Sequence, residues 1–138
     1  MKRHKTSLRE IEDLRAVVER DLMDAAVPEI SADRRFATAY NGVLQLSKIA
    51  IACSGYRVSG LGHHQTTFEA LELAMGPAVS AGVTYFDMCR RKRNQVDYDL
   101  AQVASETEVE ELLAKVEEFR QTVEAWIGAH HPAYKPPA

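Results

Sequence analysis

Glycine and proline are sparse through the middle of the sequence, which favours helices over a strand-rich fold. No apolar run approaches the roughly 18 residues that a membrane-spanning helix needs. The basic residues 2–5 are followed by polar residues instead of an apolar stretch, so they do not predict a signal peptide. By elimination, we expect a cytoplasmic protein that does not associate with a membrane.

Cysteine is also scarce, and the absence of a CxxC pair excludes a zinc ribbon. Cys53 and Cys89 fall within apolar helical patterns, so we expect buried free thiols and no disulfide. His63 and His64 have no acidic or cysteine partner nearby, and adjacent side chains point in different directions. A glycine-rich phosphate loop is absent as well. We therefore predict no metal and no cofactor.

Charge is unevenly distributed along the chain. The formal net charge of -3 argues against a surface uniformly built to hold nucleic acid. Residues 2–5 and 90–93 are nevertheless basic, whereas residues 105–124 hold seven Glu against Lys115 and Arg120. The hydrophobic fraction of 46% is typical of a globular chain with a real core.

Apolar residues recur at three- and four-residue spacing in the longer segments, as one buried helix face requires. The expected helices cover about 7–26, 31–55, 66–75, 78–98 and 105–127. Three of them open with a capping-box pattern, at Ser7, Thr66 and Ser105. The second helix is apolar around most of its circumference, which is typical of a central helix in a bundle.

These elements predict an all-α fold, an antiparallel bundle of four to five helices joined by short connections. Residues 56–65 are expected to form the longest loop. The length of 138 residues fits a single domain over 1–138, with its core at about 7–127. The Pro-rich residues 128–138 are expected to form a mobile tail.

The helix expected at 78–98 combines an apolar stripe with charged residues. At about 100° per residue, Arg93 falls inside the arc that begins with Val79 and Phe86. Arg90 and Asp97 fall at the edge of that arc. A cation on a buried stripe is costly unless it is paired.

Three interpretations of this stripe are open. In the first interpretation, the basic residues 90–93 lie in a solvated last turn of the helix, where their charges complement the helix dipole. This interpretation suits Arg91 and Lys92. Alternatively, Arg93 and Asp97, four residues apart, form a buried structural pair. In the third interpretation the stripe opens onto a groove or a second subunit, where Arg93 meets a phosphate.

The string at 89–99 resembles the signature region of the HEPN superfamily (higher eukaryotes and prokaryotes nucleotide-binding domains), specifically at Arg93, Asn94, Asp97 and Tyr98. The resemblance covers roughly residues 7–127 in helix order. It implies a helical bundle that is often dimeric. It also implies kinship with ribonuclease toxins that pair with minimal nucleotidyltransferase antitoxins.

The catalytic pattern of that family is an Arg, commonly followed by a polar residue, with a His four to six intervening residues later. Arg93 and Asn94 match its first half, but residues 98–100, beginning with Tyr98, stand where the His would be. Tyrosine is a poor general base at neutral pH because its ordinary pKa is about 10. We therefore expect a module without catalysis.

The leading hypothesis is a HEPN-like homodimer that binds a nucleotide, RNA or a nucleotidyltransferase-type antitoxin. The expected binding residues are Arg90, Arg93, Asn94, Asp97 and His64. One alternative is a divergent, metal-independent ribonuclease toxin with Arg93, Asn94 and Tyr98 as its catalytic residues. Another is a homodimer with a purely structural or interaction role.

Overall fold

The computed structural model describes residues 1–58, 64–97 and 103–137, with the backbone alone at 64–65 and 96–97. The described helices are α1 (Leu8–Ala25), α2 (Ala32–Cys53), α3 (His64–Met75), α4 (Ser80–Asp97) and α5 (Glu106–His130). Short 3-10 helices lie at η1 (Pro77–Val79) and η2 (Pro132–Tyr134), and strands β1 (Lys2–Arg3) and β2 (Tyr56–Arg57) form a small antiparallel pair. The prediction of an all-α bundle is confirmed.

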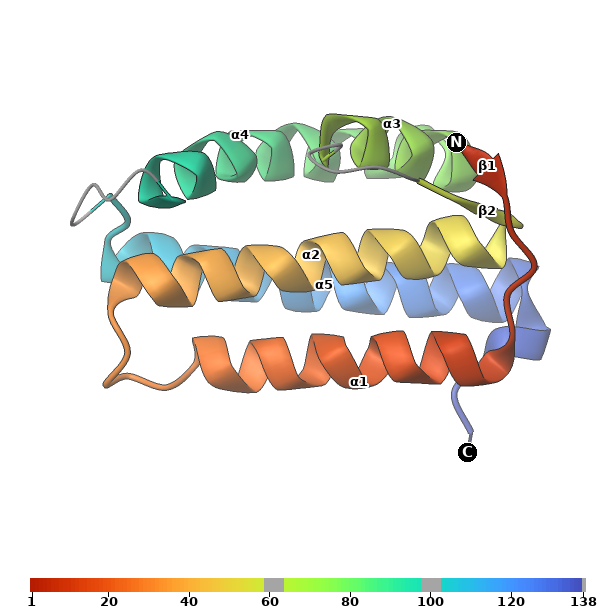
Figure 1. Ribbon diagram of the computed structural model, residues 1–138, viewed down its shortest axis with the longest axis horizontal. Helices are drawn as coiled ribbons and strands as arrows, with labels where there is room; N and C mark the ends of the chain where they lie inside the picture. The colour runs from red at the N-terminus through yellow and green to blue at the C-terminus, as the bar shows by residue number, and fades with distance from the viewer. Residues whose placement is uncertain (59–63, 98–102, 138) are drawn as a thin grey trace.

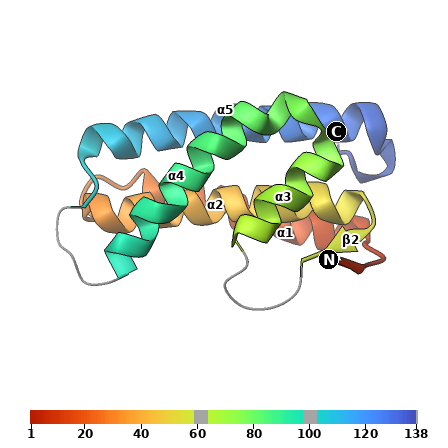
Figure 2. The same cartoon turned by 90° about the horizontal axis from the view of Figure 1, so that it is seen from above.

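Helix α2 lies at the centre and packs against α1, α3, α4 and α5. Figure 1 shows α1 on one side of α2 and α5, and α3 and α4 on the other. In the view from above, α3 and α4 cross α2 obliquely (Figure 2). The interior is formed by the apolar faces of all five helices. Its largest fully buried side chains are Tyr40, Ile11, Leu46, Ile49, Leu71, Leu112, Ile127, Val18, Val43, Val109, Val116 and Val123.

Two of the three predicted helix caps are present. Ser105 and Glu108 form a complete capping box, in which each side chain binds the other residue's backbone N–H. The Ser7 hydroxyl accepts from the backbone N–H of Glu10, whose carboxylate instead binds residues before the helix. The prediction for Thr66 is wrong, because α3 already begins at His64.

Both ends of the chain differ from the sequence-based expectation. Strand β2 lies within the segment expected to be a loop, and β1 pairs with it. Helix α5 continues to His130, past the predicted end at 127. Beyond it, Tyr134 packs against the core and its carbonyl accepts from Arg15 Nη2 at 2.6 Å. The sequence placed the tail outside the core because its prolines interrupt the helical pattern.

Two arginines join α1 to α5 in different environments. Arg15 is 13% exposed and donates from Nε and Nη2 to the Glu124 carboxylate, with both distances 2.8 Å. Arg120 is 31% exposed and binds Glu19 and Glu117, whose side chains are 58% and 45% exposed. The Arg15–Glu124 pair is bidentate and less exposed, so it is expected to stabilise the fold more than the Arg120 pairs do.

We predict that Arg15→Met lowers the free energy of unfolding by about 2 kcal/mol, since it leaves Glu124 and the Tyr134 carbonyl without their donor. The matched change Arg120→Met is expected to cost about 0.5 kcal/mol or less, as for other exposed ion pairs. Urea unfolding of both variants measures the difference. Equal losses in the two variants would contradict the expectation that Arg15 contributes more stability than Arg120.

Candidate functional site

The C-terminal half of α4 carries the basic cluster, defined here as Arg90, Arg91, Lys92 and Arg93. The apolar stripe before it is buried, as predicted, at Val79, Val83, Phe86 and Cys89. Arg93 continues this stripe and is half-buried, as the helical wheel indicated, and so is the following Asn94.

Asp87 holds two arginines of the cluster. Arg90 Nε donates to Asp87 Oδ1 at 2.8 Å, and Arg91 Nη2 lies 3.4 Å from Asp87 Oδ2. Sequence reasoning missed Asp87, although a carboxylate three and four residues before two arginines is a recognisable pairing pattern on a helix. Asp87 therefore sets the positions of Arg90 and Arg91 on the same side of α4.

Lys92 corrects one expectation, because it is not an ordinary solvated side chain. Its Nζ lies 2.6 Å from Glu108 Oε2 and donates to the Val103 carbonyl at 3.2 Å. Lys92 thus joins the end of α4 to the start of α5. The hydrogen bond from Lys92, followed by that from the Ser105 backbone, lowers the pKa of the Glu108 carboxyl.

Tyr40 lies on α2 beneath the cluster and is fully buried. Burial raises the pKa of its hydroxyl well above the ordinary value, while the positive charges of Arg90 and Arg93 oppose that rise. The hydroxyl therefore stays protonated and lies close enough to both guanidinium groups to feel their charge. The sequence placed Tyr40 correctly in the core but gave no sign that its hydroxyl is influenced by the charges of Arg90 and Arg93.

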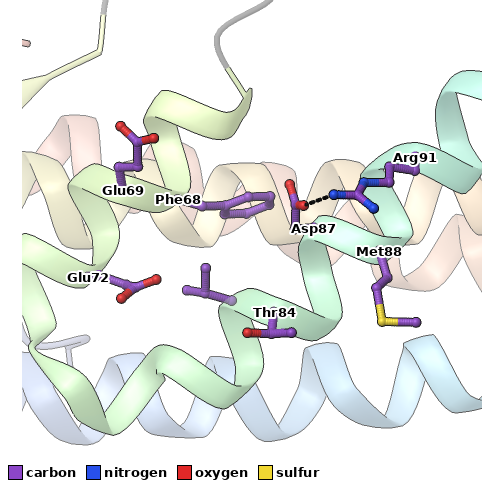
Figure 3. Close-up of a pocket in the computed structure, with 8 residues that line it drawn as sticks. Phe68, Glu69, Glu72, Thr84, Asp87, Met88 and Arg91 are labelled. Carbon is purple, nitrogen blue, oxygen red and sulfur yellow. Dashed lines mark hydrogen bonds and ion pairs between the residues drawn. The ribbon is translucent and has the colours of Figure 1, made fainter.

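A groove between α3 and α4 adjoins the cluster. It has a volume of about 350 Å³ and is lined by Phe68, Glu69, Glu72, Val83, Thr84, Asp87, Met88 and Arg91. Figure 3 shows the two glutamates on the α3 side and Arg91 on the α4 side. Phe68 connects the groove to the buried layer, because its ring meets Tyr40 edge-on at 6.3 Å. Arg91, which the sequence assigned to ordinary surface, is thus the member of the cluster that lines the groove.

Several predicted site residues are only partly accounted for. Asp97 ends α4 and His64 begins α3, but their side chains lie outside the described part of the structure. His63 and Tyr98 lie outside the described residues altogether. The Arg93–Asp97 pair and the role of Tyr98 therefore stay predictions.

Cys53 and Cys89 are free and buried, as predicted, and burial raises the pKa of each thiol to about 11. Both are therefore protonated and unreactive at neutral pH. Within residues 1–58, 64–97 and 103–137, no group of His, Cys and acidic side chains could hold a metal ion. Over the same ranges, no helix is long and apolar enough to cross a membrane.

No protein-family model, curated protein or solved structure matches the chain significantly.

The Lys92–Glu108 pair makes stability depend on pH. A lowered carboxyl pKa contributes stability that is present above the ordinary pKa of 4.5 and is lost as the pH falls through the lowered value. We predict that Glu108→Gln reduces the free energy of unfolding at pH 7 by about 0.5 kcal/mol, as for a partly exposed ion pair. The difference in unfolding free energy between the parent chain and the variant is expected to disappear below pH 4.

Urea unfolding between pH 7 and pH 3 measures this difference. Gln at position 108 can still accept from the Ser105 N–H, so the substitution removes the charge and spares the cap. Glu110→Gln is the control, an exposed glutamate on the same helix. A difference that grows toward acid pH, or an equal effect at position 110, would be inconsistent with the proposed pairing.

Proposed function

We propose that the chain binds a phosphate-bearing ligand, a nucleotide or an RNA, through Arg90, Arg91, Arg93 and Asn94 on α4. The observation that carries the proposal is the concentration of three guanidinium groups within little more than one turn of a helix. The planar guanidinium fork matches the oxygens of a phosphate and binds them with charge-assisted hydrogen bonds.

The positions of these arginines support the proposal. Asp87 binds Arg90 through Nε, so the described contacts leave the Nη groups of Arg90 available to another acceptor. Arg91 is 71% exposed, so its guanidinium group can be reached from solvent. Lys92 is occupied by Glu108 and the Val103 carbonyl, so it is not assigned a role in binding.

The HEPN resemblance supports the same region, because its most specific residues include Arg93 and Asn94. It extends the proposal to a homodimer and to a nucleotidyltransferase-type antitoxin as protein partner. The absence of a His after Arg93, where Tyr98 and its neighbours stand, supports binding without catalysis. No contact among the described residues favours the ribonuclease alternative over this one.

The test is binding of a fluorescein-labelled single-stranded RNA, followed by anisotropy at several salt concentrations, with unlabelled ATP as competitor. We expect the double variant Arg91→Gln, Arg93→Gln to weaken binding at least tenfold. We also expect it to reduce the slope of log affinity against log salt by about 1 to 1.5, as for the loss of two phosphate contacts. Competition by ATP would indicate a nucleotide site, and its absence an RNA site.

Arg20→Gln is the matched control, because this arginine is 65% exposed and lies on α1, away from α4 in Figure 1. Circular dichroism and urea unfolding verify that each variant is folded. Failure of the parent chain to bind RNA or ATP, or an equal loss in the Arg20 variant, would overturn the proposal. RNA cleavage that disappears in Arg93→Ala would replace it with the ribonuclease alternative.

A further inference from the structure

A second concentration of positive charge lies at the other end of the bundle, at the β1–β2 pair (Figure 1). Gly55, with φ at +91°, lets the chain turn back after α2 and enter β2. His4 N–H donates to the Gly55 carbonyl at 2.9 Å, and this bond holds the start of the chain across the end of α2.

The strand register places two cations opposite each other. Lys2 pairs with Arg57, and Arg3 pairs with Tyr56. Like charges directly opposite on an antiparallel pair are destabilising. Both side chains are exposed, so the strand pair presents positive charge to solvent, and Arg57 also lines the neighbouring cavity.

A cavity of about 400 Å³ lies next to this pair. Its apolar wall comes from α1 and α2 through Leu14, Ile51 and Ala52. The polar lining of the cavity and its side next to the strands are formed by His4, Glu10, Lys48, Tyr56, Arg57 and Val58. An apolar wall with convergent polar groups is the usual construction of a small-molecule site.

The charges around the cavity are not balanced. Glu10 is already engaged, because its Oε1 lies 2.7 Å from His4 Nε2 and accepts from Thr6 Oγ1 at 2.8 Å. These two hydrogen bonds, His4 first, lower the pKa of the Glu10 carboxyl. Lys48 and Arg57 are exposed, and neither has a carboxylate within ion-pair distance among the described residues.

We propose that this cavity binds a small organic anion with an apolar body. Lys48 and Arg57 hold its carboxylate or phosphate head, and Leu14, Ile51 and Ala52 contact the apolar part. The wall favours a ligand with an apolar part over a purely electrostatic site, because a charged group alone would leave Leu14, Ile51 and Ala52 without a contact. This site is separate from the cluster on α4 and does not depend on the function proposed for that cluster.

The test uses octanoate and octyl phosphate as probes, titrated into the full chain by isothermal titration calorimetry. Octanol, which has the same apolar chain and no charge, is the comparison compound. We expect saturable binding of one molecule per chain for at least one of the two anions, and the tighter one identifies the preferred head group. Octanol is expected to bind at least tenfold more weakly, because it cannot form the charge-assisted hydrogen bonds.

Lys48→Gln and Arg57→Gln are each expected to weaken binding of the preferred anion about tenfold. Lys115→Gln, an exposed lysine on α5 away from this cavity, is the control and is expected to change nothing. The double variant Arg91→Gln, Arg93→Gln is also expected to bind the anion normally, which separates the two proposed sites. The proposal is overturned if neither anion binds saturably, if octanol binds equally well, or if the Lys48 and Lys115 variants behave alike.

Discussion

Burial of α2 on almost every side is the constraint on which the rest of the structure depends. A helix enclosed in this way must satisfy its polar side chains within the protein. The Ser47 hydroxyl donates back to the Val43 carbonyl at 2.9 Å, and Arg35 Nε donates to the Ala25 carbonyl at 2.8 Å. Within the described residues, no buried side-chain nitrogen or oxygen lacks a hydrogen-bond partner. Ser47 is therefore satisfied within α2 itself, whereas Arg35 links α2 to the end of α1.

The same enclosure explains where charge can gather. The sides of α2 are covered by four helices, so the clusters form where neighbouring elements end. The basic cluster lies toward the N-terminal end of α2, where α4 finishes, and the β1–β2 pair lies at its C-terminal end (Figure 1). The glutamates of α5 account for much of the opposite charge, so a net charge of -3 conceals two basic regions. Average composition was therefore a poor guide to the surface.

Sequence periodicity was sufficient for features that depend on one helix at a time. It located the helices, the buried stripe of α4 and the half-buried Arg93, because each of these follows from 3.6 residues per turn. It could not find β1 and β2, since strands of two residues show no alternation. It also misjudged Lys92, whose partners Glu108 and the Val103 carbonyl belong to a later part of the chain. Such contacts depend on how helices pack and are invisible in local spacing.

The basic cluster illustrates how packing divides residues of similar sequence. The expectation of a last helical turn is wrong for these four cations, because α4 continues to Asp97 and has no basic residue in its last turn, where the dipole acts. Their contacts differ, however: Lys92 is bound to α5, Arg90 is oriented by Asp87, and Arg91 is left at the groove. A dipole effect requires only charge near the helix end and gives no reason for a carboxylate to orient two guanidinium groups on one side. The contacts around Asp87 follow the i,i+3 and i,i+4 spacing of ion pairs on a helix, which separates Arg90 and Arg91 from Lys92 without reference to the dipole.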